Sequence, residues 1–188
     1  MVKFRWENQY YRKNKKDNQS LYVRPGCNLK VRLVGEPVKV VRAFTNDDRC
    51  IMLDSEETGQ KLKEKYPNKI GNISVRYACW CFDRHDDKIK VLEMPKFVFN
   101  AIGKQSKSGK KKISEQEDGC DFRITTNDKT GMDVRYTVDY EKDTSLTDIE
   151  KHMILVQQAN KKRPYDLTKL FKSCSYLDAG VKLSRQEK

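Results

Sequence analysis

The sequence lacks any long apolar segment. No run approaches the roughly 18 consecutive apolar residues that a membrane-spanning helix requires. The first residues are basic and polar, without the apolar core of a signal peptide. We therefore expect an intracellular, cytoplasmic protein with no membrane partner, built as one domain or one domain with appendages.

Histidine is also scarce, and no catalytic constellation is evident. His85 and His152 are the two histidines, and each is more readily explained as structural or solvated. The sequence has neither a glycine loop ending in Gly-Lys-Ser or Gly-Lys-Thr nor a Gly-x-Ser-x-Gly motif. Aspartates at residues 83–87, with Glu93, offer carboxylates for a divalent-metal nuclease, but aspartate is common in turns for conformational reasons. We predict no enzymatic activity and no catalytic residues.

The sequence contains six cysteines, which in a basic protein of this size do not form a secreted disulfide framework. Cys79 and Cys81, joined by Cys27 or Cys50, are the candidate zinc ligands. Structural zinc sites usually take two cysteines from a turn, with two to four residues between them. A Cys-x-Cys pair within an apolar strand is better explained as two small core residues. We predict free thiols, no bound metal and no cofactor.

The charge is strongly one-sided. Lysine and arginine outnumber aspartate and glutamate by 39 to 27, a formal net charge of +12. The excess is concentrated in residues 1–16, 104–112 and 161–163. A single lysine cluster is commonly a solvated loop, whereas three in one small domain favour a polyanionic partner.

Residues 73–82 (ISVRYACWCF) are the most informative segment. Successive side chains of a strand point to opposite faces, so Tyr77 falls on an apolar core face, and Arg76, Trp80 and Phe82 fall on the other. Aromatic rings next to arginine on an open sheet face are suited to stacking unpaired bases. The alternative for Trp80 is that an appended element such as the C-terminal helix covers it, and for Tyr77 it is core packing.

Turn signals and periodicity predict a mainly β fold. We expect strands at 28–34, 38–45, 50–53, 73–82, 88–93, 120–126 and 132–140, with helices at 55–66, 94–102 and 147–160 and a helical turn at 166–172. This order fits a small antiparallel barrel of the oligonucleotide-binding (OB-fold) type with an inserted helix and a helical C-terminal extension; other small β-barrels fit too. The predicted parts are an arm at 1–20, a core at 21–145 with a flexible basic loop at 104–118, and the extension at 146–188.

The predicted nucleic-acid contacts combine rings for stacking with cations for phosphates. They are Arg76, Tyr77, Trp80, Phe82, Lys30, Arg32, Arg123, Arg135, Lys110, Lys111 and Lys112, with Trp6, Tyr10, Tyr11 and Arg12 on the arm. The alternatives to single-stranded DNA binding are an RNA- or duplex-binding module of the same fold class, the metal nuclease, and an assembly protein whose charge serves an acidic partner.

Three segments in order resemble a known family. They are the Tyr77-to-Trp80 strand running into an aspartate-containing turn, KVLEMPKFVFNAIG at 90–103, and GCDFRITTNDKTGMDVRYTVDY at 119–140. Together they are similar to the core of the single-stranded DNA-binding proteins of tailed bacteriophages, the T4-type helix-destabilising proteins and their relatives. The resemblance implies an OB-fold that coats unpaired DNA during phage replication, recombination and repair in the infected bacterial host cell. It also implies neighbouring copies of the chain and phage replication and recombination proteins as partners.

The sequence departs from that family in two respects. The T4-type members hold zinc through a His/Cys cluster, and that spacing is absent here, which favours a metal-free relative. Many members end in an acidic tail that recruits replication partners, whereas this sequence ends KLSRQEK. Either the tail lies beyond this sequence or partner recruitment works differently.

Overall fold

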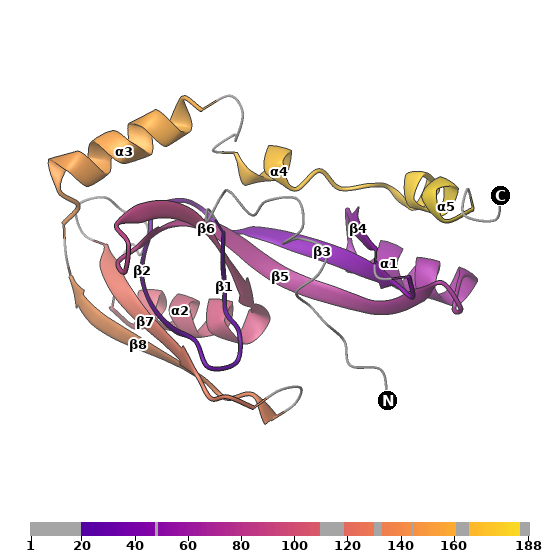
Figure 1. Ribbon diagram of the computed structural model, residues 1–188, viewed down its shortest axis with the longest axis horizontal. Coiled ribbons are helices and arrows are strands. Elements are labelled where there is room, and N and C mark those ends of the chain that lie inside the picture. The colour runs from indigo at the N-terminus through magenta and orange to yellow at the C-terminus, as the bar shows by residue number, and fades with distance from the viewer. Residues whose placement is uncertain are drawn as a thin grey trace. The chain divides into compact units, whose positions relative to one another are not determined.

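The computed structural model shows a mainly β protein with a mixed sheet and several helices (Figure 1). It describes residues 20–47, 49–109, 119–129, 133–143, 145–160 and 166–184. The chain forms two compact units. The first comprises the described residues of Val40–Val75 and Phe171–Lys188, and the second those of Gln19–Lys39 and Arg76–Leu170. This division differs from the predicted one, which cut the chain at residues 20 and 145.

The second unit contains most of the sheet. Its strands and helices are β1 (Ser20–Tyr22), β2 (Asn28–Leu33), the greater part of β5 (Ile70–Asp83), β6 (Lys88–Pro95), α2 (Lys96–Gly109), β7 (Cys120–Thr126), β8 (Tyr136–Asp143), α3 (Asp148–Gln158) and α4 (Leu167–Leu170). The strands follow the order β1-β6-β5-β2-β7-β8. All neighbours in this order are antiparallel except β1, which runs parallel to β6. Within the described residues β8 does not pair with β1, so the sheet is not closed.

The core of this unit lies between the curved sheet and α2, which contacts β6 and β8 (Figure 1). The residues predicted for the core face of β5 do lie there: Cys79 and Cys81 are buried together with Phe122 and Ile124 of β7. From α2, Val98 and Ile102 enter the same cluster. The structure therefore confirms the core face that the period-2 alternation predicted for β5 and β7.

Helix α2 corrects a prediction at its C-terminal end. The sequence predicted that this helix would end at Gly103 and that residues 104–118 would form a loop. In the structure α2 continues to Gly109. A glycine inside a helix costs only about 1 kcal/mol relative to alanine. Burial of Val98 and Ile102 offsets that cost. Residues 110–118 of the predicted loop lie outside the described part.

The first unit is a smaller α/β assembly. It contains most of β3 (Val38–Thr45), whose residues Val41–Phe44 pair with β4 (Cys50–Leu53), and its helices are α1 (Glu56–Lys65) and α5 (Tyr176–Ser184). As predicted, Ser55 caps α1, accepting a hydrogen bond from the Thr58 backbone. Gly59 lies inside α1 because a side chain there would come within 3.1 Å of Ile73. The glycine thus permits close contact between α1 and the sheet.

Two further features agree with the sequence. Gly26 has a φ of 73°, a conformation that favours glycine, in the predicted Pro-Gly turn before β2. Thr147 and Glu150 form a reciprocal capping box at the start of α3. Among the described helices, none has the length and apolar character needed to span a bilayer.

Candidate nucleic-acid interface

The predicted stacking platform on β5 is not exposed. Trp80 and Phe82 are each 1% exposed, and Arg32, which lies opposite Phe82 in the strand register, is completely buried. The expectation that these three side chains face solvent is therefore wrong. Arg76, on the same side of β5, is half-buried opposite Pro95.

The C-terminal extension contacts the sheet next to these buried side chains. Helix α3 contacts β6, the strand next to β5. Its Ile154 is buried, as are Leu146 before the helix and Leu167 after it. Arg84, which follows β5, forms an ion pair with Glu150 of α3, and its guanidinium carbon lies 5.9 Å from the centre of the Phe82 ring. The alternative considered for Trp80, a covering helix, is the one that fits this packing.

Three other predicted cations do share one face of the sheet. Lys30 of β2 lies opposite Arg123 of β7 in the register, and both side chains are about two-fifths exposed, at 43% and 41%. Arg135 precedes β8 and is exposed, as predicted from the hairpin alternation. Its backbone is positioned by a hydrogen bond from its N–H to the Asn127 side chain. We call Lys30, Arg123 and Arg135 the basic outer face.

Glu141 of β8 bridges two members of the basic outer face. Its Oε2 lies 2.5 Å from Lys30 Nζ, and its Oε1 lies 2.6 Å from both Nε and Nη2 of Arg123. The hydrogen bond from Lys30, reinforced by Arg123, holds the pKa of Glu141 below its ordinary value despite partial burial. Sequence reasoning did not identify Glu141, because its contact with the two cations depends on how three strands are aligned with one another.

An aromatic cluster lies where α2 meets the sheet. The Tyr77 and Phe99 rings are parallel, with centres 3.9 Å apart, and both pack against the core. Phe97 lies 5.9 Å from the ring of Tyr136 and is 59% exposed. Tyr77 is therefore chiefly a packing residue, and Phe97 presents its ring to solvent. We use the name aromatic cluster for these four residues.

Phe97 was missed as a binding residue, although the sequence contained a signal for it. With about 3.6 residues per helical turn, Phe97 lies about 100° away from Val98 around the helix. It therefore lies outside the buried stripe formed by Val98 and Ile102. The preceding residue, Lys96, is also exposed.

The aspartates of the 83–87 turn hold a buried lysine. Lys90 Nζ lies 2.7 Å from Asp83 and 2.6 Å from Asp86. Burial lowers the pKa of Lys90, but hydrogen bonds to both carboxylates outweigh it, so the pKa is raised overall. Over the described residues there is no group of three or more His, Cys, Asp or Glu side chains placed to hold a metal ion. The carboxylates suggested for a nuclease thus neutralise a neighbouring cation.

The candidate zinc cysteines lie in the core. Cys79 and Cys81 are fully buried, and burial raises the pKa of the Cys79 thiol to about 12 and that of Cys81 well above its ordinary value. The Cys79 thiol also donates a hydrogen bond to the Gly35 carbonyl, 2.8 Å away. Zinc binds thiolates, which this environment disfavours.

We expect native protein to show three fast thiols toward Ellman's reagent near pH 8. Cys27, Cys50 and Cys174 are half-buried and should react first, while Cys79, Cys81 and Cys120 are buried and should react only on unfolding. The same reaction in denaturant gives the full count of six as a control. Rapid native reaction of more than three thiols would contradict this assignment.

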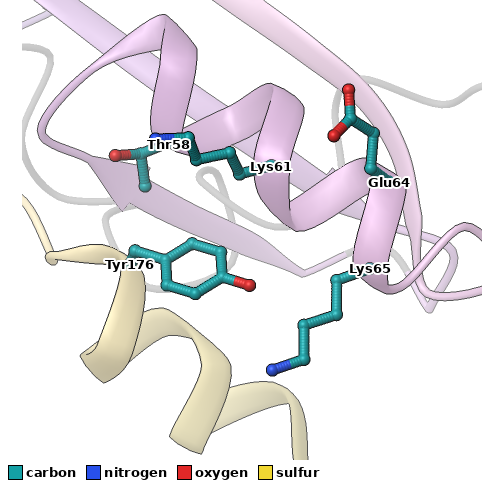
Figure 2. Close-up of a pocket in the computed structure, with 5 residues that line it drawn as sticks. All are labelled: Thr58, Lys61, Glu64, Lys65 and Tyr176. Carbon is teal, nitrogen blue, oxygen red and sulfur yellow. The ribbon is translucent and has the colours of Figure 1, made fainter.

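A separate depression lies in the first unit. It has a volume of about 660 Å³ and is lined by Thr58, Lys61, Glu64 and Lys65 of α1 and by Tyr176 of α5 (Figure 2). Lys65 Nζ lies 5.8 Å from the centre of the Tyr176 ring. Lys61 is ion-paired with Glu57, and Glu64 adds a second acid, so this depression lacks the positive bias of the basic outer face.

Several predicted contacts lie outside the described residues. They are Trp6, Tyr10, Tyr11 and Arg12 of the arm, and Lys110, Lys111 and Lys112 of the predicted loop.

Comparison of the chain with protein-family models gives no match, and comparison with curated protein sequences gives no significant match.

Proposed function

We propose that this protein binds single-stranded DNA with little sequence preference, through the basic outer face and the aromatic cluster. The observation that carries the proposal is that both features reach the start of β8, at the edge of the strand order: Arg135 of the first and Tyr136 of the second are neighbouring residues with side chains on opposite faces, so a strand that passes around this edge could meet both. A strand could place phosphates on Lys30, Arg123 and Arg135 and stack a base on Phe97. Base stacking on an aromatic side chain tolerates any base.

The strand order supports an OB-fold as the finer description of the second unit. An OB-fold is a five-stranded, partly open barrel. Strands β6, β5, β2, β7 and β8 lie next to one another in this order, and α2 joins β6 to β7. In this fold class, oligonucleotides commonly bind the face of the second and third strands. Those strands correspond to β5 and β6, whose outer side is covered here, so we assign DNA contact to β2, β7, β8 and the start of α2.

The net charge of +12 supports a polyanionic partner. The resemblance to phage single-stranded DNA-binding proteins adds a biological setting to the proposal. In that setting the chain would coat and protect unpaired DNA during phage replication, recombination and repair in the infected cell. Neighbouring copies on the strand and phage replication proteins would be its partners.

Titration of a labelled oligo-dT, followed by fluorescence anisotropy at several salt concentrations, tests the proposal. If about 4–6 phosphates are neutralised, the log–log plot of affinity against salt should have a slope of roughly −3 to −4. RNA and duplex DNA of equal length serve as competitors, and preferential competition by either would favour the RNA- or duplex-binding alternative. Absence of oligo-dT binding at low salt would refute the proposal.

A further inference from the structure

The contact between Glu141, Lys30 and Arg123 joins three strands on the outer side of the sheet. Arg123 directs two nitrogens at one carboxylate oxygen, and Lys30 contacts the other, at 2.5–2.6 Å. Asn28 also accepts a hydrogen bond from Arg123 Nη1 at 3.3 Å, which helps to orient the guanidinium. Both cations remain about two-fifths exposed, so their charged groups lie within reach of a ligand in solvent.

This arrangement matches what a phosphodiester needs. A backbone phosphate carries two non-bridging oxygens that share one negative charge, as the two oxygens of a carboxylate do. A guanidinium fork with an ammonium beside it is a common arrangement for binding phosphate oxygens. Lys30 and Arg123 therefore offer a preformed position for one phosphate, and Glu141 lies in it.

We propose that Lys30 and Arg123 form a phosphate-binding seat that Glu141 occupies in the absence of DNA, so that a strand phosphate binds there by displacing Glu141. The inference rests on the proposed function and adds that a side chain of the protein, Glu141, competes with the DNA phosphate for the two cations. Since one anion replaces another, the net gain at this position is smaller than the two cations alone would provide. Glu141 thus weakens binding while keeping the cations in place.

Neutralising the competitor tests this inference. We expect Glu141→Gln to tighten oligo-dT binding about threefold to fivefold, the scale of a partly exposed ion pair. The matched control is Glu64→Gln, which makes the same substitution and the same charge change at an exposed position of α1, in the other unit. Net charge alone would tighten both variants equally, and that result would overturn the proposal.

A second comparison tests whether the effect of Glu141 depends on Lys30 and Arg123. In a variant that already carries Lys30→Ala and Arg123→Ala, Glu141→Gln should leave the affinity for oligo-dT unchanged, because neither cation remains for Glu141 to pair with. If urea unfolding shows that Glu141→Gln is poorly folded, Glu141→Asp replaces it; this variant keeps the charge but shortens the side chain, and it should also tighten binding.

The two proposals fail in different ways. If wild-type protein binds oligo-dT and Glu141→Gln does not bind more tightly, only the displacement inference is wrong. If wild-type protein shows no oligo-dT binding, the proposed function is wrong, and the inference falls with it.

Discussion

Replacement of Trp80 by alanine should lower the free energy of unfolding by about 3–5 kcal/mol, the usual cost of deleting a large buried aromatic side chain. Trp80 is 1% exposed and lies on β5, opposite Val91 of β6, which is equally buried. Truncation would leave a cavity beside β6. Urea unfolding followed by far-UV circular dichroism measures the loss.

A conservative variant and a fluorescence experiment separate burial from stacking. Trp80→Phe retains an aromatic ring and should cost clearly less stability than Trp80→Ala. The chain has two tryptophans, so a Trp6→Phe variant reports Trp80 alone. We expect its emission to resist acrylamide quenching and to change little when oligo-dT is added. A fully stable Trp80→Ala variant that binds oligo-dT poorly would instead restore Trp80 as a stacking residue.

The second large effect concerns Phe97. We expect Phe97→Ala to weaken oligo-dT binding about tenfold or more, because a base stacked on an aromatic ring contributes about 1–3 kcal/mol. Stability should change little, since the ring is 59% exposed. Anisotropy titration measures the affinity, and urea unfolding measures the stability.

Leu155 provides a matched control for the loss of an exposed apolar side chain. It is 60% exposed on α3 and lies outside both the basic outer face and the aromatic cluster. Leu155→Ala should leave oligo-dT affinity within about twofold of wild type, as is usual for surface substitutions away from special features. Equal weakening by the two alanine variants would remove Phe97 from the proposed site.

The hairpin of β7 and β8 shows what alternation alone can predict. In a strand, each residue's face follows from its position, so Arg123 and Arg135 could be assigned to the side opposite Phe122 and Ile124. The structure confirms this assignment, with Ile124 opposite Val138 and both in contact with the core. The same rule separated Cys79 and Cys81 from Trp80 on β5.

Alternation could not predict whether the second face of β5 meets water. That depends on segments distant in the chain; the extension, whose buried Ile154 and Leu167 lie more than seventy residues further along, contacts the neighbouring strand β6. No local pattern around Trp80 contains this information, because a strand covered on both faces and a strand with one exposed aromatic face can show the same local pattern of residue types. Glu141 was missed for a related reason, because its two partners come from different strands.

The amino-acid sequence by itself determined the positive charge, the positions of most strands and helices, and the side of each strand on which a residue falls. These properties follow from composition, from local conformational preference and from the two-residue repeat of extended backbone. Tertiary structure alone decided which faces are covered: it buried Trp80 and Phe82, and it placed Glu141 between Lys30 and Arg123. The physical reason is that burial and ion pairing depend on segments brought together from distant parts of the chain, whose contacts no local pattern encodes.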